Sequence, residues 1–339
     1  MHPSEISPST PSAGTGDDAW WKELNRYQWF VFIVASLGWL FDTMDQQLFN
    51  LARQPAITEL VGAMPGDAAA GGRVAEAAGM ATSIFIVGWA LGGLIFGILG
   101  DRIGRVKTMM ITILMYSAFT GLSALSVGVW DFAVFRFLTG LGVGGEFAVG
   151  VTLVAEVMSD HARPHALGWL QALSALGNVG AALLSLAMTR LEETGAIGSY
   201  WRAMFLIGIV PALLTVPIFL RVHEPEKWKA AAARRTAARQ AGLSDPSVEL
   251  GSLRDLFGDP RWRHNTIVGM LLALAGVIGL WGIGFFSPDL TRTVFRKSYE
   301  AQGLSDREIT SKLHYLASIV FLVQNIGAFF GIYAFKSVT

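Results

Sequence analysis

The chain alternates long apolar runs with shorter polar segments. Hydrocarbon about 30 Å thick needs roughly 20 residues of helix to cross it. Eight runs reach this length with few charges, so the pattern predicts an all-α protein with eight membrane spans. The runs are approximately 29–50, 80–100, 108–128, 132–158, 166–188, 201–220, 267–288 and 315–335.

The polar segments divide these spans into groups. Residues 1–26 are rich in Ser, Pro and Gly at their start and predict a disordered tail without a signal peptide. Residues 27–221 hold six spans and predict a six-helix bundle. Residues 222–263 form a hydrophilic linker, and residues 264–339 hold two further spans. The Lys227–Gln240 part of the linker, rich in Ala and Arg, reads either as an amphipathic helix on a membrane surface or as a solvated loop.

Basic residues are distributed unevenly between the two sides of this arrangement. If the N-terminus is cytoplasmic, the inner segments hold about fifteen Lys and Arg and the outer ones about eight. The positive-inside rule therefore predicts a multi-pass protein of the bacterial inner membrane with a cytoplasmic N-terminus.

The composition indicates that the chain lies in a lipid bilayer, and it excludes several classes of function. Of the 339 residues, 52% are hydrophobic and 15% charged, and the mean hydropathy is +0.46. The net charge is zero, which argues against a nucleic-acid partner. Cysteine is absent, so thiolate catalysis and thiolate metal sites are excluded. Phosphate-binding loops, metal-spaced histidines and nucleophile motifs are also missing, so we expect no enzyme, metal or cofactor.

Two carboxylates lie in the first span. Asp42 and Asp45 are three residues apart and would share one helix face. Two neighbouring carboxylates do not readily both ionise in a low dielectric, so the pair predicts a group that can carry a proton. The alternative is that the helix ends early, because Arg53 and a long polar loop to Gly79 follow, and that both side chains contact water outside.

The fourth span contains two further charges, Arg136 and Glu146. Charges inside a membrane span are costly and usually face the protein interior or a water-filled path. Ten residues place them about 15 Å apart along the helix, so each needs its own partner.

The fifth and seventh spans suggest a binding surface. Gln171, Ser174 and Asn178 form one polar stripe, which predicts either ligand contacts or packing between helices. The seventh span has no amide and carries Trp281 among other aromatic residues, which favours an organic acid or aromatic ligand over a hexose.

A short repeat relates the second span to the eighth. Gly93, Gly97 and Asp101 follow four-residue steps, and Gly327 and Gly331 repeat that step. Small residues at this spacing let helices approach closely, so the repeat predicts two related six-helix halves, the second cut off after two helices.

The segment 97–107 joins the second and third spans. It contains Gly97, Asp101, Arg102, Gly104 and Arg105, and it resembles the signature loop of the major facilitator superfamily, with one residue inserted before the final lysine. A loop whose basic residues merely fix topology would explain Arg102 but neither Asp101 nor the glycines.

Other segments support the same resemblance, which covers roughly residues 42–228. The Arg136–Glu146 segment is similar to the superfamily's fourth helix, and Asp42 with Asp45 is similar to a motif of its aromatic-acid:proton symporters. Glu156 and Arg163 resemble the inner end of the fourth helix in sugar-porter-like members, and residues 223–228 resemble the segment after the sixth helix. The resemblance implies a major facilitator fold in which Arg105 and Glu156 pair as an inner latch.

These observations together lead us to expect a proton-coupled symporter of a small organic anion that works by alternating access. We expect it to act as a monomer in the lipid bilayer. Its expected proton carriers are Asp42, Asp45 and Glu146, and its expected substrate contacts are Arg136, Gln171, Asn178 and Trp281. The expected gate residues are Gly97, Asp101, Arg102, Gly104, Arg105, Glu156 and Arg163. A sugar porter and a truncated, non-transporting membrane protein remain alternatives.

Overall fold

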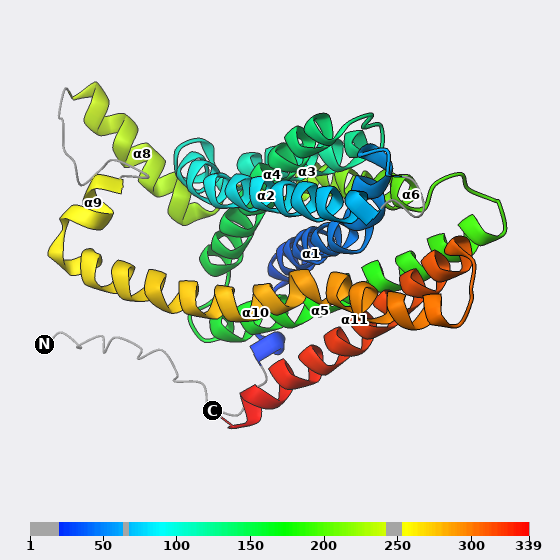
Figure 1. The fold of residues 1–339 in the computed structure, drawn as a ribbon. Coiled ribbons are helices and arrows are strands. Elements are labelled where there is room, and N and C mark those ends of the chain that lie inside the picture. The colour runs from blue at the N-terminus through cyan, green and yellow to red at the C-terminus, as the bar shows by residue number, and fades with distance from the viewer. Residues whose placement is uncertain (1–19, 64–67, 242–252, 339) are drawn as a thin grey trace, which may run out of the picture.

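The computed structural model describes residues 20–63, 68–241 and 253–338, and within them the protein is a bundle of long helices (Figure 1). A short 3-10 helix, η1 (Trp20–Lys22), precedes the bundle. The long helices of the first half are α1 (Arg26–Leu60), α2 (Ala68–Ile103), α3 (Arg105–Ser123), α4 (Val129–Val157) and α5 (Ala162–Glu193). A sixth, broken segment consists of α6 (Tyr200–Ile207), η2 (Val210–Leu214) and α7 (Thr215–Arg221).

The second part of the chain adds two short and two long helices. They are α8 (Glu226–Gln240), α9 (Leu253–Gly258), α10 (Pro260–Ala301) and α11 (Asp306–Val338). Each predicted span coincides with one of the long helical segments, so the six-helix bundle followed by the first two helices of a second bundle is confirmed. Residues 1–19 of the predicted tail lie outside the described residues, as do linker residues 242–252, whereas residues 20–26 contain η1 and the first residue of α1.

Five described segments are long and apolar enough to cross a membrane by length and composition. They are 70–103, 105–123, 129–157, 162–193 and 200–221. The 35-residue helix α1 falls short of that apolarity because Asp42, Asp45, Gln46 and Gln47 interrupt it, yet it runs through the centre of the bundle.

Local sequence explains where several helices begin. Asn25 accepts a hydrogen bond from the backbone of Gln28, whose side chain accepts one from Asn25 in return, and this capping box starts α1. The Asp131 carboxylate accepts hydrogen bonds from the backbone N–H groups of Val127 and Gly128 at the start of α4. The sixth span was predicted as one helix. It is broken near Gly208 and Pro211, because proline supplies no N–H for a helical hydrogen bond.

Helices α2 and α4 touch backbone to backbone through glycine. A Cβ atom on Gly92 would lie 2.1 Å from the carbonyl oxygen of Leu141, and one on Gly144 would lie 1.9 Å from that of Trp89. The Gly97 position makes only ordinary contact at 4.0 Å. The expectation of close packing is wrong for Gly327, because no atom lies within 4 Å of its Cβ position. The closest contacts between α2 and α4 therefore use Gly92 and Gly144, which are not the glycines of the repeat.

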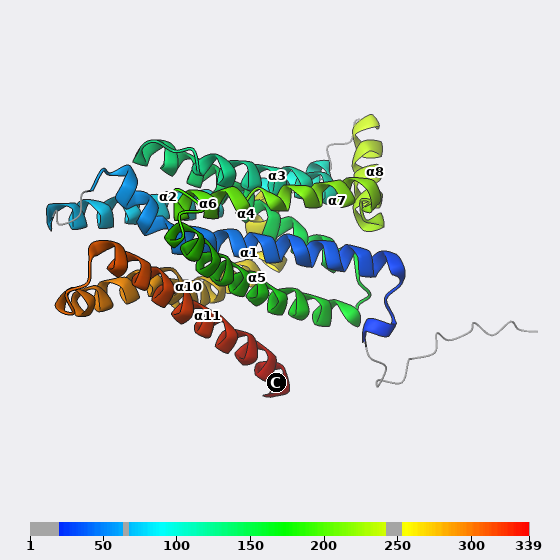
Figure 2. The same ribbon diagram turned by 90° about the vertical axis from the view of Figure 1, so that its right-hand side faces the viewer.

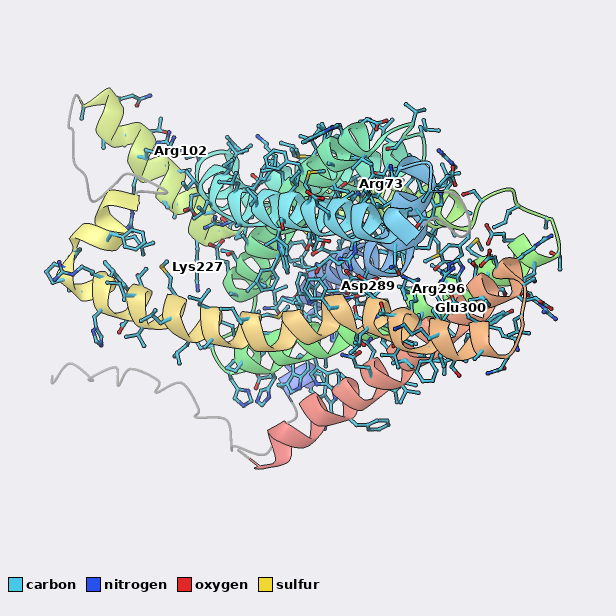
Figure 3. All side chains as sticks on the ribbon, in the orientation of Figure 1. Arg73, Arg102, Lys227, Asp289, Arg296 and Glu300 are labelled. Atoms are coloured by element: carbon cyan, nitrogen blue, oxygen red, sulfur yellow. The ribbon has the colours of Figure 1, made fainter. Side chains whose placement is uncertain are left out.

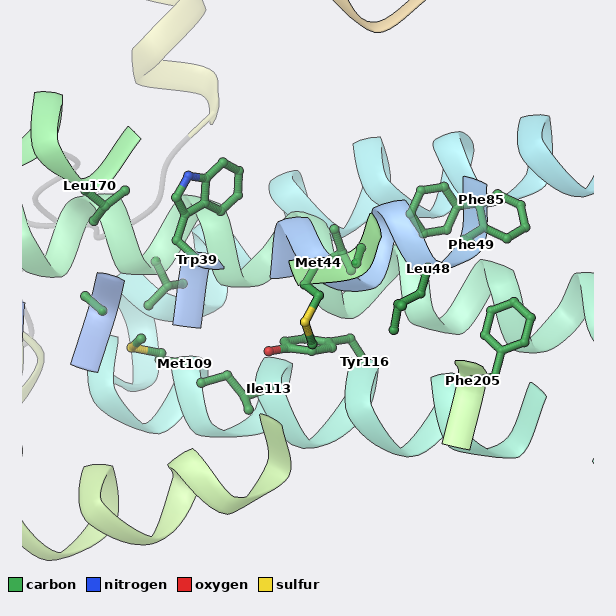
Figure 4. Close-up of a cluster of buried hydrophobic side chains, with 14 of the residues drawn as sticks. Trp39, Met44, Leu48, Phe49, Phe85, Met109, Ile113, Tyr116, Leu170 and Phe205 are labelled. Carbon is green, nitrogen blue, oxygen red and sulfur yellow. The ribbon is translucent and has the colours of Figure 1, made fainter. Parts of the chain in front are cut away.

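Buried apolar side chains fill the centre of the first bundle (Figure 4). Figure 4 shows Met44, Leu48 and Phe49 of α1 between Phe85 of α2 and Tyr116 of α3. This core surrounds the polar part of α1 and separates it from the outside of the bundle.

The two ends of the bundle differ in how α10 and α11 meet the first half. We call the end at which α8 lies the linker end. Figures 1 and 2 show α11 separating from α5 toward this end. Residues 261–265 and 267–276 of α10 are exposed, whereas Pro288, Thr291 and Arg292 nearer the opposite end are buried. The second part of the chain is therefore attached to the first mainly at the opposite end.

Candidate functional site

Asp42 and Asp45 lie within helix α1 and are buried. Their side chains are 0% and 1% exposed, and none of their carboxylate oxygens has a hydrogen-bond partner among the described residues. Helix α1 continues to Leu60 and both aspartates are buried, so the alternative in which it ends early and exposes them is wrong.

Glu146 of α4 joins the same region. Its carboxylate is also fully buried and has no hydrogen-bond partner in the described structure. It lies against α1 at Gly38, where an added Cβ would be 2.6 Å from its Oε1 atom. Asp42 experiences charge repulsion from both Glu146 and Asp45, so these three acids form one electrostatic group. We call Asp42, Asp45 and Glu146 the carboxylate cluster.

Arg136 is the cation beside this cluster. Its Nη1 atom lies 4.0 Å from Oδ2 of Asp45, and its Nη2 atom donates to Ser123 at 2.7 Å and to Thr139 at 3.0 Å. Its guanidinium also lies 4.7 Å from the ring centroid of Phe205. Arg136 and Glu146 therefore have separate surroundings, as their spacing predicted, and Arg136 is held by groups inside the first bundle.

Tyr116 of α3 is a member of this region that the sequence did not single out. It is fully buried, its hydroxyl has no described hydrogen-bond partner, and it is within electrostatic range of all three acids. No spacing signal marks it, because a lone tyrosine in an apolar helix resembles any core residue. Among the described residues, no group of three side chains is arranged to hold a metal ion.

The predicted substrate contacts fall in different places. Gln171 is exposed on α5, whereas the Asn178 side chain donates to Oδ1 of Asn325 on α11 at 2.7 Å. Ser174 is buried and donates to the Gln171 carbonyl at 2.6 Å. Trp281 belongs to α10, and its side chain is outside the described part of the structure. The polar stripe of α5 thus makes at least one contact between helices.

At the linker end, Arg105 is the centre of a charged network. Its Nη2 atom donates to Oε1 of Glu156 at 3.0 Å, and its Nη1 atom lies 2.5 Å from Oδ1 of Asp101. Asp101 and Glu156 come from the ends of α2 and α4, so Arg105 joins three helices at the linker end. Arg102 is exposed and does not enter these contacts.

Glu224 completes the network from the chain segment before α8. Its carboxylate accepts the backbone N–H groups of Arg105 at 2.7 Å, Val106 at 3.2 Å and Lys107 at 3.3 Å, and so caps the N-terminus of α3. Gly104 has φ of 118°, and a Cβ there would be 2.1 Å from Oε1 of Glu224. Only glycine fits this turn and this approach. The sequence placed Gly104 in the signature-like loop but gave Glu224 no role of its own.

The remaining members of the linker end are held nearby. Trp228 of α8 donates its indole N–H to the Asp101 carbonyl at 2.8 Å. Arg163 bonds the Ala155 carbonyl at 2.7 Å and pairs with Asp160 at 2.6 Å, so it closes the α4–α5 connection and takes no described part in the Arg105 network. Figure 3 shows Arg102 and Lys227 at this end, far along the bundle from Arg296 and Glu300. We call Asp101, Arg105, Glu156 and Glu224 the linker-end network.

The family model that matches this sequence is that of the Major Facilitator Superfamily, over residues 27–336. A provisionally named metabolite transport protein of Haemophilus influenzae is 30% identical over 83% of this chain and 64% of its own length. The cis,cis-muconate transport protein of Acinetobacter baylyi is 32% identical over 62% of this chain and 48% of its own. The chain thus spans about half to two thirds of the length of these curated relatives.

A solved D-xylose-proton symporter has the same fold. It superposes with a TM-score of 0.65 at 18% identity, covering 92% of this chain and 69% of its own. At that identity the likeness concerns the fold alone. The relatives named above are transporters, which agrees with the expectation that this chain is not an enzyme.

Proposed function

This chain belongs to the Major Facilitator Superfamily, and on that premise we propose that it carries a small organic anion across a membrane together with protons. Movement follows alternating access, in which two helix bundles rock about a site near the membrane midplane. The proposed activity has three parts, which are symport, proton coupling and an anionic substrate.

The observation that carries the proposal is the carboxylate cluster. Three buried acids lie near one another, one of them, Asp45, lies 4.0 Å from Arg136, and none of their oxygens has a described hydrogen-bond partner. A charged carboxylate in such a place costs several kcal/mol, of the order of a buried unpaired ion. The cluster therefore binds protons, and a change in its exposure as the bundles rock releases them. Structural packing alone would be served better by apolar side chains.

The substrate class rests on the relatives and on the chemistry of the helices. One relative is named for cis,cis-muconate and another, provisionally, for 4-methylmuconolactone. Both names describe small unsaturated organic molecules, and the apolar, aromatic seventh helix is compatible with such a ligand. We propose that Arg136 balances the charge of Asp45 and that Gln171, Asn178 and Trp281 contact the substrate in another state of the cycle. A sugar substrate is the alternative that the xylose symporter likeness suggests, and it rests on fold alone.

The linker-end network is proposed to latch one gate of this cycle. Arg105 connects α2, α3 and α4 through Asp101 and Glu156, and Glu224 ties α3 to the linker. The distribution of basic residues supports a cytoplasmic linker end, an inner-membrane location and a cytoplasmic N-terminus. Single cysteines at Ala233 and Gly198, introduced into this cysteine-free chain, test that orientation with an impermeant maleimide. Labelling of Ala233→Cys from outside intact cells contradicts it.

The test of function is transport by the purified chain in proteoliposomes with an imposed pH gradient. We expect uptake of cis,cis-muconate or a related organic acid against its gradient. Asp42→Asn, Asp45→Asn and Glu146→Gln should each abolish this accumulation and leave exchange of substrate largely intact, because exchange requires no net proton release. Glu226→Gln, which changes an exposed acid of α8, is the matched control and should transport normally.

Uptake that persists undiminished in all three cluster variants removes proton coupling through these residues. If the chain takes up xylose but none of the organic acids, the sugar alternative is favoured. A chain that moves neither class favours the non-transporting alternative.

A further inference from the structure

A groove at the linker end lies between α2 and α8. Its volume is about 410 Å³, and its described lining consists of Arg102 at the end of α2 and Ala232, Arg235, Thr236 and Gln240 of α8. Figure 3 shows Arg102 next to α8. Two guanidinium groups from different helices therefore share one groove, and no acid is among the described residues that line it.

Neither of these arginines is paired with an acid of the protein. Within the described part of the chain, Arg102 and Arg235 form no hydrogen bond and no ion pair. The acids beside them are engaged elsewhere, because Asp101 pairs with Arg105 and Glu226 pairs with Lys229. Two like charges that share a groove repel each other, so an anion bound between them is attracted by both.

Helix α8 is fixed against the end of α2 beside this groove. Trp228 donates its indole N–H to the Asp101 carbonyl at 2.8 Å. Residues 228, 231, 232, 235 and 238 are partly buried, and their spacing of three and four places them on one face of α8. In Figure 2, α8 runs across the direction of the long helices, as a helix along a membrane surface does.

The composition of α8 leaves charge as its only means of binding a membrane. Apart from Trp228, its 15 residues include no apolar side chain larger than that of alanine. Lys227, Lys229 and Arg234 are exposed on it. Peripheral helices bind membranes through buried apolar area and through attraction to anionic lipids, and α8 offers mainly the second.

The groove also lies at the end of an apolar stripe on α2. Val87, Leu91 and Ile95 are 53%, 41% and 51% exposed, and Ile98 and Arg102 continue the same helix face. In a membrane, such an exposed apolar face contacts lipid chains. Arg102 follows Ile95 by seven residues, or about 10 Å along the helix, which places its charge at the level of the lipid headgroups.

We propose that Arg102 and Arg235 bind the headgroup phosphate of an anionic phospholipid whose acyl chains lie along α2. Arginine suits this role because its planar guanidinium donates parallel hydrogen bonds to phosphate oxygens. The bound lipid connects α2 to α8 and so holds the linker against the bundle, beside the linker-end network. This site goes beyond the proposed function, since it requires a membrane but neither proton coupling nor a particular substrate. A free phosphate ion shares the headgroup chemistry but lacks the chains that contact α2.

The test titrates the purified chain in detergent with phosphatidylglycerol or phosphatidylcholine and measures by native mass spectrometry the fraction of protein that retains each lipid. Phosphatidylcholine has the same phosphate but adds a positive charge, which two arginines disfavour. The unchanged protein should therefore bind phosphatidylglycerol at least about fivefold more tightly than phosphatidylcholine. Arg102→Gln and Arg235→Gln should each weaken phosphatidylglycerol binding by about fivefold, because each removes one basic group from the headgroup.

Arg234→Gln is the matched control for these variants. It removes the same charge from the neighbouring position of α8, which is exposed and does not line the groove. At physiological salt, where distant exposed charges are screened, it should bind phosphatidylglycerol like the unchanged protein. Equal losses in Arg234→Gln and Arg235→Gln overturn the proposal, because binding would then follow total charge instead of one site.

Two further measurements cover misfolding and the identity of the anion. Arg102→Lys and Arg235→Lys keep the charge but lose the parallel donors, so they should fold normally and bind phosphatidylglycerol with an affinity between those of the unchanged protein and the glutamine variants. Lysine variants that bind like the unchanged protein overturn the role of the guanidinium groups. Excess inorganic phosphate should not displace phosphatidylglycerol, and displacement by it identifies a site for free phosphate and overturns the lipid as its occupant. Equal affinity for the two lipids overturns the proposal as well.

Discussion

The linker-end network and the carboxylate cluster place acidic groups in opposite situations. At the linker end, Glu156 and Asp101 contact Arg105, and Glu224 accepts three backbone N–H groups. In the cluster, the acids are more deeply buried and none has a described hydrogen-bond donor. The first arrangement uses charge to hold helix ends together. The second buries Asp42 and Glu146 without a described partner that stabilises their charge, which is the usual mark of groups retained for function.

The largest difference in unfolding free energy should be between variants of the two aspartates in the carboxylate cluster. Asp45→Asn removes the counter-ion of the fully buried Arg136 and should lower the free energy of unfolding by about 3 kcal/mol. Asp42→Asn removes repulsion from Glu146 and Asp45 and should leave stability unchanged or raise it. Thermal unfolding in detergent compares them. Equal losses in both variants would show that Asp42 also has a stabilising partner.

The next effect concerns the turn at the linker end. Gly104→Ala places a Cβ atom against Glu224 at a backbone angle that side chains rarely adopt, so it should cost about 2 kcal/mol of unfolding free energy. Gly79→Ala on α2 is the matched control, since its Cβ position is open. It should be neutral or slightly stabilising. A Gly104→Ala variant as stable as the control would mean that Glu224 can move aside without cost.

A smaller effect tests whether Arg105 and Glu156 act as a pair. Arg105→Glu and Glu156→Arg should each make the purified protein less resistant to trypsin, and the double reversal should recover part of the loss. We expect a coupling free energy of about 1 kcal/mol, reduced because Asp101 also contacts Arg105. Strictly additive losses would show that the two side chains are not energetically coupled.

The smallest effect concerns the cap on α3. Glu224→Gln keeps an acceptor but removes its negative charge, so the favourable interaction with the helix N-terminus should fall by about 0.5 kcal/mol. Glu226→Gln, two residues away and exposed, should have no measurable effect on the unfolding free energy. Added salt should reduce the difference between the two variants, because screening weakens the charged cap. A salt-independent difference would point to packing instead.

Much of the fold could be predicted because a membrane imposes strict limits on sequence. Helix length, apolar composition and the charges of the loops follow from the hydrocarbon thickness and from the cost of burying charge, so each predicted span coincided with a long helical segment. Glycine contacts were harder to predict. A Gly-x-x-x-Gly spacing says that a helix can approach a neighbour but does not say which face does, and the closest approach proved to use Gly92 and Gly144 instead of Gly97.

The sequence by itself determined the helical bundle, the segment that contains Arg105 and the presence of acids in α1 and α4. These are properties of single segments, in which spacing along one helix fixes which residues share a face. Only the tertiary structure decided that Glu224 caps α3, that Tyr116 lies beside three acids and that Arg53 and Arg292 share Asp289. Each of these contacts joins different segments of the chain, and Arg292 donates to the Leu51 carbonyl of another helix, which Pro55 leaves without its usual partner. Such partners depend on how helices rotate and cross when they pack, which no local pattern of polar and apolar residues contains.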